Sequence, residues 1–341
     1  MKPQRYYREK YVRHLPTRFC PGCGNGIILN AFVRALDELN IPQERILCAS
    51  GIGCSAWIPS PHFNGDTIHT THGRAIAFAT GAKVYNRNLK IVVFTGDGDG
   101  AGIGGNHLIH AARRNIEMTV ILVNNMNYGM TGGQIAPTTP HGRLTTTTPY
   151  GNPEDPFNLV ALASAAGATY VARWSTCHVL ELTKSIKEAL QHEGFSFIEV
   201  LSQCPTQQRR LFRLSGSASE LPQRIVEMFS ESTYVKGRPM KKDYIYVIPK
   251  KSPEDVFKSV EATLLQFNPK LKIVDHMAFG RLIRIDADRI GEVKEGLRDL
   301  DSIESIADPL EGKIELGVFN NYQRPEYVKT LYDIIEKARA G

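Results

Sequence analysis

The sequence of 341 residues predicts an α/β protein with a doubly wound parallel sheet at its core. Apolar, β-branched runs such as residues 90–95 and 118–123 alternate with segments whose apolar residues recur at helical spacing. Gly-rich or polar turns follow several of these runs, which is typical of open sheets whose strands end at a ligand. Because strand and helix alternate from residue 25 to residue 201, we expect parallel strands with helices on both faces.

The elements follow one another in a regular order. Residues 52–68 are rich in Pro, Gly and Asn, so we expect an irregular loop that lines a site. Residues 132–155 form a second long polar loop, and loops of this length within a domain usually serve function or a partner. We expect helices at residues 25–39, 75–84, 106–115, 156–166 and 178–192, and strands at residues 46–50, 90–95, 118–123, 169–174 and 195–201.

The alternation breaks near the C-terminus, where a small inserted domain is predicted. Its pattern is βαββαβ, typical of a ferredoxin-like split β-α-β sandwich. The insert would span residues 241–308, and the main domain residues 1–240 completed by 309–341. It contains no cysteine, so it cannot itself carry an iron-sulfur cluster. A docking or regulatory role and a structural cap are equally compatible with the pattern. Strands are expected at residues 244–248, 271–274, 279–285 and 303–307, with helices near residues 253–265 and 290–300.

The GDGDG motif at residues 96–100 is the most informative feature of the sequence. It follows a buried strand directly, its glycines let the backbone approach phosphates, and Asp97 offers a carboxylate. The next strand brings Asn124 and Asn125 to the same edge of the sheet. A carboxylate and an amide oxygen, together with diphosphate oxygens, are ligands that Mg²⁺ accepts. The motif therefore predicts a diphosphate and magnesium site, which we favour over a Gly-rich turn without a ligand.

Four of the six cysteines can meet at one end of the sheet. Cys20 and Cys23 lie on the tight CPGCG turn, Cys54 follows the Gly-rich turn at residues 51–53, and Cys204 follows the last strand. In an intracellular chain such cysteines indicate metal or redox chemistry rather than disulfides. The single CxxC motif is also compatible with zinc or with a thioredoxin-like pair.

The remaining two cysteines have no such pattern around them. Cys48 lies in an apolar strand and Cys177 opens a helix, so we expect both to be ordinary buried thiols.

Composition limits the classes of partner. The N-terminal residues are basic and aromatic without an apolar stretch, and no apolar run is long enough to span a bilayer. We therefore expect a cytoplasmic protein without a membrane partner. The net charge of +6 is modest and predicts no nucleic-acid partner. It would favour an acidic protein partner, although an ordinary solvated surface explains it equally well.

Longer strings carry a family resemblance. GDGDG followed one βαβ unit later by Asn-Asn resembles the thiamine diphosphate motif, and IGGNHLIHAARRN and NNMNYGMTGGQ are similar to the beta subunit of 2-oxoacid:ferredoxin oxidoreductases, most of all the 2-oxoglutarate type. The resemblance implies the thiamine diphosphate-binding fold, with Mg²⁺ held by Asp97, Asn125 and the backbone carbonyl of Asn127. The residues that it implies for cofactor binding are His72, Gly96, Asp97, Gly98, Asn125, Asn127, Tyr128, Gly129, Met130 and Thr131.

The same resemblance implies a second cofactor and a reaction. Cys20, Cys23, Cys54 and Cys204 would hold one 4Fe-4S cluster. The implied reaction is coenzyme A-dependent oxidative decarboxylation of a 2-oxoacid, with 2-oxoglutarate favoured and ferredoxin as the electron acceptor. The glutamate that activates thiamine would lie on an alpha subunit in a heterodimer, so the chain alone should be inactive.

Three alternatives remain open at this point. The first is a branched-chain or aryl 2-oxoacid as substrate, because Ala56 and Trp57 follow the GIGCS string where family members often place a basic residue. The second is a thiamine diphosphate decarboxylase or carboligase without a cluster. The third is a metal-binding or assembly protein that uses only the CPGCG turn.

Overall fold

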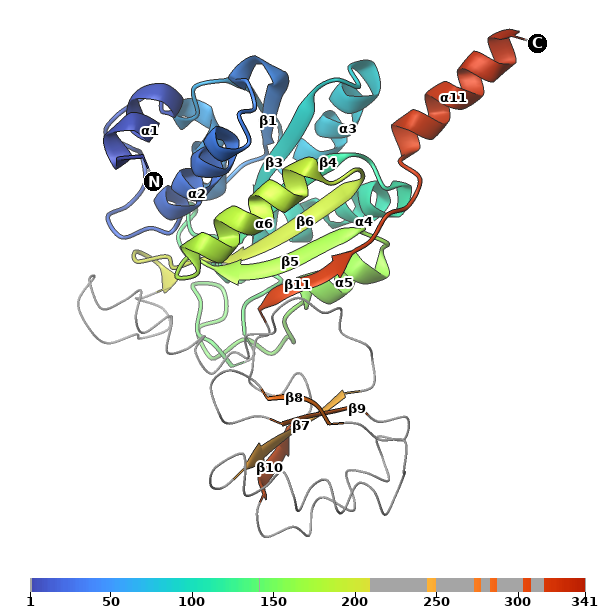
Figure 1. Ribbon diagram of the computed structural model, residues 1–341. Helices are drawn as coiled ribbons and strands as arrows, with labels where there is room; N and C mark the ends of the chain where they lie inside the picture. Colours follow the sequence, from blue (N-terminus) through green and yellow to red (C-terminus); the bar gives the residue numbers. More distant parts are fainter. Residues whose placement is uncertain are drawn as a thin grey trace. The chain divides into compact units, whose positions relative to one another are not determined.

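The computed structural model describes residues 2–140, 142–208 and 316–340, together with the backbone of four further strands (Figure 1). The chain divides into two compact units. The larger comprises Met1–Val226 and Val318–Gly341, and the smaller comprises Glu227–Gly317.

The larger unit is built on a seven-stranded sheet with the order β11-β5-β6-β4-β3-β1-β2. The neighbouring strands from β5 to β2 are all parallel. Residues of β1, β4, β5 and β6 are buried along the whole length of each strand, as expected for a sheet covered on both faces. The strands are β1 Ile46–Ser50, β2 Asp66–His69, β3 Lys90–Gly96, β4 Met118–Asn124, β5 Tyr170–Ser175, β6 Phe195–Leu201 and β11 Gly317–Asn321.

Helices cover both faces of this sheet (Figure 1). The helices α2 (Asn25–Glu38) and α6 (Val179–Gln191) pack together on one face, and α3 (Ala75–Tyr85), α4 (Gly105–Arg114) and α5 (Leu159–Ala165) lie on the other. Small and branched apolar side chains from α3, α4 and α5 form one continuous core with the strands. The predicted doubly wound α/β fold is confirmed.

Shorter helices and two terminal helices complete the unit. The helix α1 (Gln4–Tyr11) packs on α2, and its Tyr7 and Tyr11 are buried. The remaining helical elements are α1 Gln4–Tyr11, η1 Gln43–Arg45, η2 Cys54–Trp57, η3 Ile58–His62, η4 Asp97–Ile103 and α11 Tyr327–Ala340.

The five strands and five helices expected between residues 25 and 201 are all present, with small shifts at their ends. The helix α5 begins at Leu159 instead of residue 156, because the Asn158 side chain accepts a hydrogen bond from the Ala161 N–H and caps the helix there. The expectation of an irregular loop through residue 68 was wrong at its end. Residues 66–69 form the edge strand β2, which pairs with β1 although only four residues long.

The smaller unit contains a four-stranded antiparallel sheet with the order β10-β7-β9-β8. The strands fall at or close to the positions expected from the sequence, and their order is the one that a βαββαβ chain produces. The unit extends beyond the predicted insert of residues 241–308 on both sides. The two helices expected within it lie outside the described residues. The strands are β7 Tyr244–Pro249, β8 Ile273–His276, β9 Ile283–Asp286 and β10 Ile303–Ala307.

In the part of the chain that the structure describes, no helix is both long enough and apolar enough to cross a membrane.

Candidate functional site

Six chain segments meet at the carboxyl edge of the large sheet. The strands β6, β4, β3 and β1 are neighbours in the sheet, so the segments that follow them lie side by side. The helices α2 and α3 return the chain to the start of β1 and of β3, and each must therefore begin at this same edge. This topology brings the CPGCG turn and the segment THGR before α3 close to GDGDG and to the Asn-Asn segment.

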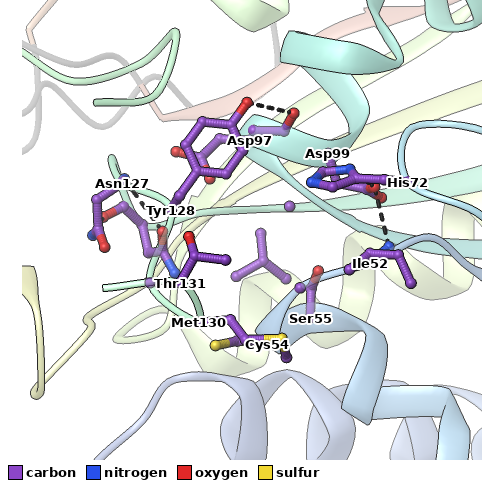
Figure 2. Close-up of a pocket in the computed structure, with 16 residues that line it drawn as sticks. Ile52, Cys54, Ser55, His72, Asp97, Asp99, Asn127, Tyr128, Met130 and Thr131 are labelled. Atoms are coloured by element: carbon purple, nitrogen blue, oxygen red, sulfur yellow. Dashed lines mark hydrogen bonds and ion pairs between the residues drawn. The ribbon is translucent and has the colours of Figure 1, made fainter. Parts of the chain in front are cut away.

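A cavity of about 520 Å³, open to solvent, lies at this edge (Figure 2). The ten residues predicted to bind the cofactor all line it, although they come from three separate segments of the chain. The cavity is also lined by Ile52, Gly53, Cys54, Ser55, Asp99 and Val123.

Asp97 begins η4 and lines the cavity, and only 3% of its surface is exposed. Burial raises the pKa of its carboxyl group to about 7, despite hydrogen bonds from the Thr138 hydroxyl and from backbone N–H groups. The Thr138 Oγ1 atom donates to Asp97 Oδ2 at 2.6 Å. A raised pKa means that the surroundings do not compensate the charge of the carboxylate. The site therefore fits a bound cation, whose positive charge would compensate the carboxylate.

The Asn-Asn segment adds oxygen atoms beside Asp97. The amide of Asn127 is buried, and its Nδ2 atom donates to the Asn125 carbonyl at 2.7 Å. Its Oδ1 atom is buried and has no hydrogen-bond partner. The Asn125 amide oxygen receives only a long contact of 3.4 Å from the Asn127 N–H. Asn125 and Asn127 line the same cavity as Asp97, and a cavity with one carboxylate and amide oxygens with spare capacity suits Mg²⁺.

No three His, Cys, Asp or Glu side chains within the described ranges form a cluster that could hold a metal ion. The predicted magnesium site does not require one. It has a single carboxylate, and its other ligands would be amide, carbonyl and diphosphate oxygens.

The glycines of this edge allow close packing around the cavity. A Cβ atom at Gly98 would collide with the ring of Tyr128, whose hydroxyl donates to the Gly98 carbonyl at 3.1 Å. Because glycine has no Cβ atom, the GDGDG backbone lies directly against the Tyr128 ring, and both residues line the cavity.

Asp99, the second carboxylate of GDGDG, joins three segments and was not singled out from the sequence. Its Oδ1 atom accepts hydrogen bonds from the backbone N–H groups of Ile52 at 3.1 Å and Gly73 at 2.7 Å. Its Oδ2 atom accepts from the Thr95 hydroxyl at 2.6 Å. The sequence signal that could have indicated a role for Asp99 is the repeat of Asp-Gly within GDGDG. The two carboxylates of this repeat have separate roles, because Asp97 is the predicted metal ligand and Asp99 binds backbone N–H groups.

His72 lies against Asp99 at the wall of the cavity (Figure 2). Its Nδ1 atom is 2.7 Å from Asp99 Oδ1, in an orientation too poor for a hydrogen bond. The contact places the imidazole directly against the Asp99 carboxylate. The predicted role of His72 as a cofactor contact is compatible with this position and stays a prediction.

Thr138 belongs to a buried polar network that sequence reasoning missed. Its Oγ1 atom is also 2.9 Å from Asn124 Oδ1, and Asn124 Nδ2 donates to Glu199 Oε1 at 2.7 Å. Glu199 Oε2 in turn accepts from Arg173 Nε at 2.7 Å. All of these residues except Asp97 lie behind the cavity wall, and all are buried. The long loop after residue 132 thus supplies the Thr138 hydroxyl, which donates a hydrogen bond to Asp97, the predicted metal ligand.

The cysteine-bearing segments are hydrogen-bonded to one another. On the CPGCG turn the Cys23 N–H donates to the Cys20 carbonyl at 3.0 Å. Directly after the turn, Asn25 Nδ2 donates to the Cys54 carbonyl at 3.0 Å. The Gly24 N–H donates at 3.4 Å to the carbonyl of Gln203, the neighbour of Cys204. These bonds bring the four predicted cluster ligands into one neighbourhood.

The pKa shifts of the cysteines also indicate that the four thiols lie close together. Burial raises the pKa of Cys23 to about 12, and the nearby Cys204, Cys54 and Cys20 raise it further. Burial, with Cys204 and Cys20, raises the pKa of Cys54 to about 11. A 4Fe-4S cluster binds each thiolate through a different iron, so its ligands stand farther apart than those of a single ion. The grouping fits such a cluster.

The two sites adjoin. Cys54 lines the cavity itself, and a Cβ atom at Gly129 would lie 3.5 Å from Cys204 Sγ and 3.5 Å from Asn127 Oδ1. Gln208 connects them as well, because its Oε1 atom accepts from the Cys204 N–H at 3.2 Å and its Nε2 atom donates to the Asn125 carbonyl at 3.1 Å.

The other two cysteines differ from one another. Cys48 is fully buried in β1, as expected. Cys177 is exposed, so the expectation that it is a buried thiol was wrong. It lies on the turn between β5 and α6.

Comparison with known proteins places this edge in a family. Residues 51–200 match the thiamine pyrophosphate enzyme, C-terminal TPP binding domain. The 2-oxoglutarate synthase subunit KorB of Methanocaldococcus jannaschii is 55% identical over 214 residues, which cover 62% of this chain and 78% of that protein. The 2-oxoacid:ferredoxin oxidoreductase 1, subunit beta, of Aeropyrum pernix is 38% identical over 300 residues, covering 82% of this chain and 91% of that protein.

A solved structure is similar over almost the whole chain. It is a 2-oxoglutarate:ferredoxin oxidoreductase from Magnetococcus marinus with 2-oxoglutarate, coenzyme A and succinyl-CoA bound. It superposes with a TM-score of 0.67 at 30% identity and covers 97% of this chain and 90% of that chain.

The fold, the cavity and the matched domain define a thiamine diphosphate-binding subunit of an oxidoreductase. Within that class, the chain belongs to the family of 2-oxoacid:ferredoxin oxidoreductase beta subunits, and its relatives of the 2-oxoglutarate type confirm the resemblance drawn from the sequence strings.

Proposed function

We propose that the chain is the beta subunit of an enzyme that decarboxylates 2-oxoglutarate oxidatively in the presence of coenzyme A and transfers the electrons through a 4Fe-4S cluster to ferredoxin. The observation that carries this proposal is the sharing of one sheet edge by two predicted sites. Cys54 belongs to both of them, since it lines the cavity and lies among the four converging cysteines.

The residues around the cavity would divide the task of holding the cofactor. Asp97, Asn125 and Asn127 would hold Mg²⁺ and through it the diphosphate, with Gly96 and Gly98 leaving room for the phosphates. Thiamine diphosphate, when bound, stabilises the carbanion that forms as CO₂ leaves a 2-oxoacid. The aromatic and apolar side chains of Tyr128 and Met130 would limit access of water to the reacting carbon.

The geometry also supports the need for an alpha subunit. No glutamate is among the residues that line the described cavity. Glu199 is the buried glutamate behind it, and both of its oxygens are bonded to Asn124 and Arg173. We therefore propose that the carboxylate that activates thiamine comes from an alpha subunit of the same assembly.

The proposal that 2-oxoglutarate is the substrate is supported by the relatives and by the position of Trp57. The M. marinus structure was solved with 2-oxoglutarate and coenzyme A, and several relatives are named for 2-oxoglutarate. Trp57 is 37% exposed and does not line the described cavity. It therefore gives no apolar wall that would favour a branched-chain or aryl 2-oxoacid. We expect the protein to work in the cytoplasm, where ferredoxin and coenzyme A are found.

Visible spectroscopy tests the cluster directly. The alpha-beta complex, purified without oxygen, should be brown with a broad band near the blue end of the spectrum that fades on reduction with 2-oxoglutarate and coenzyme A. A colourless complex with bound thiamine diphosphate would favour the alternative of a decarboxylase or carboligase without a cluster.

Cofactor retention tests the metal site. Asp97→Ala removes the only carboxylate of the predicted magnesium site, so the purified complex should lose thiamine diphosphate while keeping its iron. Asp66→Ala, the same change at the exposed start of β2, is the matched control and should retain both. If the Asp97 variant keeps a full complement of thiamine diphosphate, the assignment of the metal ligand is wrong.

Turnover with three acids tests the substrate. The complex should use 2-oxoglutarate more efficiently than pyruvate or 2-oxoisovalerate with a low-potential acceptor. A preference of about tenfold or more for 2-oxoisovalerate, equivalent to about 1.4 kcal/mol in transition-state stabilisation, would replace 2-oxoglutarate by a branched-chain substrate.

A further inference from the structure

The positive charge of the chain is concentrated at its N-terminus. Residues 2–20 contain six basic residues and one glutamate, a net charge of +5 out of +6 for all 341 residues. The modest overall charge conceals this concentration. Most of these basic side chains are exposed and lie on α1 and on the loop of residues 12–19 that leads to Cys20.

Part of this charge is neutralised within the molecule. Lys2 and Lys10 both pair with the buried Asp37, and Arg5 pairs with Glu9 on the same helix. Arg8 and Arg18 are exposed and have no ion pair among the described residues, and the Arg13 side chain donates to the backbone carbonyl of Gly65. Three arginines thus keep an uncompensated charge at the surface.

A buried histidine holds the loop that carries two of these arginines. The Arg13 N–H donates to the His62 carbonyl at 2.7 Å, and the Arg18 N–H donates to His62 Nε2 at 2.9 Å. The Phe19 ring packs on the imidazole with a centroid distance of 5.0 Å. These contacts with His62 hold the backbone of the loop in place. The exposed side chains of the loop therefore project from an ordered backbone.

The loop leads directly to the most accessible of the predicted cluster ligands. Cys20 is exposed, Cys23 and Cys54 are partly buried, and Cys204 is buried. Because electrons pass most readily where the least protein separates donor and acceptor, they should leave a cluster on the Cys20 side. The exposed Leu15 lines an open groove together with Arg8 and Val12, and the same groove is lined by Thr17 and Gly26, which flank the cysteine turn in the sequence.

We propose that Arg8 and Arg18, together with Leu15 and the adjoining groove, form the docking surface for an acidic one-electron carrier protein. The proposal rests on the proposed function, since it requires the cluster. Positive charge around an apolar patch speeds encounter with an acidic partner and orients it, while the apolar groove supplies contact area. In each encounter the cluster loses one electron and the carrier gains it.

Charge reversal in the alpha-beta complex tests the surface. The double variant Arg8→Glu and Arg18→Glu should raise the KM for a small acidic ferredoxin by about tenfold or more at low salt and flatten its dependence on ionic strength. Reduction of methyl viologen, a small cationic acceptor, should stay within about twofold of wild type, because the cofactor sites are unchanged.

A matched control separates local from global charge. Arg45→Glu carries the same change in charge per site, but Arg45 is exposed and precedes β1, at the opposite edge of the sheet from the cysteines. It should leave the KM for ferredoxin unchanged. An equal effect of Arg45→Glu would show that overall charge alone attracts the carrier and would overturn the proposal.

The remaining outcomes distinguish other uses of the surface. If the double variant no longer assembles with the alpha subunit, as judged by size-exclusion chromatography, the surface is a subunit interface and the proposal fails. Loss of viologen reduction in the double variant alone would assign the arginines to the integrity of the cluster site. If the wild-type complex reduces neither acceptor, the proposed function itself is wrong and the docking surface fails with it.

Discussion

Replacing Thr138 by Val removes one hydroxyl group from Asp97 and leaves the shape of the side chain almost unchanged. In the wild type, Thr138 Oγ1 donates to Asp97 Oδ2 at 2.6 Å, and both residues are buried. A hydrogen bond to a charged group contributes about 1.5–3 kcal/mol. We expect the loss to appear in cofactor binding, because binding of Mg²⁺ requires the charged carboxylate that this bond stabilises. The dissociation constant of thiamine diphosphate should rise by about 10- to 150-fold.

Isothermal titration of the alpha-beta complex with thiamine diphosphate at fixed Mg²⁺ measures this change. Thr138→Ser retains the hydroxyl group and is the control, so its dissociation constant should stay close to the wild-type value. Thermal unfolding without cofactor verifies that the Val variant is folded. Binding by Thr138→Val as tight as that of the wild type would show that the hydroxyl does not support the charge on Asp97.

Three further predictions follow from the cysteines, the insert and His62. Cys204→Ser should lose iron, whereas Cys177→Ser should not, because Cys204 and not Cys177 is among the thiols that raise the pKa of Cys23; equal iron contents would show that Cys204 is not a cluster ligand. Replacing residues 243–308 by a short linker should leave iron and thiamine diphosphate bound, since the predicted core closes without the insert; loss of both would make the insert structural. Burial lowers the pKa of His62 below its usual 6.5. The folded protein therefore binds fewer protons there than the unfolded chain, and stability should fall as pH drops below about 6.5. Urea unfolding at pH 7.5 and 5.5 should show a smaller loss for His62→Asn than for wild type, and an equal loss would refute this role.

Much of the site could be predicted from the sequence because strand ends and short motifs determine it. Asp97 and Asn125 follow apolar runs of β-branched residues that can only be buried strands, so their place at the sheet edge follows from the topology of a parallel sheet. The same reasoning allowed the cysteine-bearing segments to converge, and the family resemblance selected four of the cysteines as cluster ligands. The family resemblance also extended Asp97 and Asn125 to ten residues predicted to bind the cofactor, and all ten line the cavity.

The supporting residues could not be predicted in this way. Thr138 lies in an irregular loop, where no periodicity shows which of several threonines turns inward. Glu199 and Arg173 alternate with apolar residues in strands that are buried throughout, and they read from the sequence as ordinary charges. Strand β2 escaped prediction because four residues at a sheet edge carry too little apolar pattern.

The buried pair of Arg173 and Glu199 is better explained by positioning than by stability. Such a pair commonly contributes little compared with apolar residues of the same volume, while removal of one partner costs about 3–5 kcal/mol. Here both partners have additional bonds. Arg173 Nη2 donates to Asn158 Oδ1 at 2.9 Å, and Glu199 Oε1 accepts from Asn124 Nδ2 at 2.7 Å. The second bond orients the Asn124 amide so that its Oδ1 atom faces Thr138 and accepts from the Met126 N–H at 3.1 Å. The ion pair therefore fixes, through one amide, both the hydroxyl that contacts Asp97 and the start of the turn that presents Asn127.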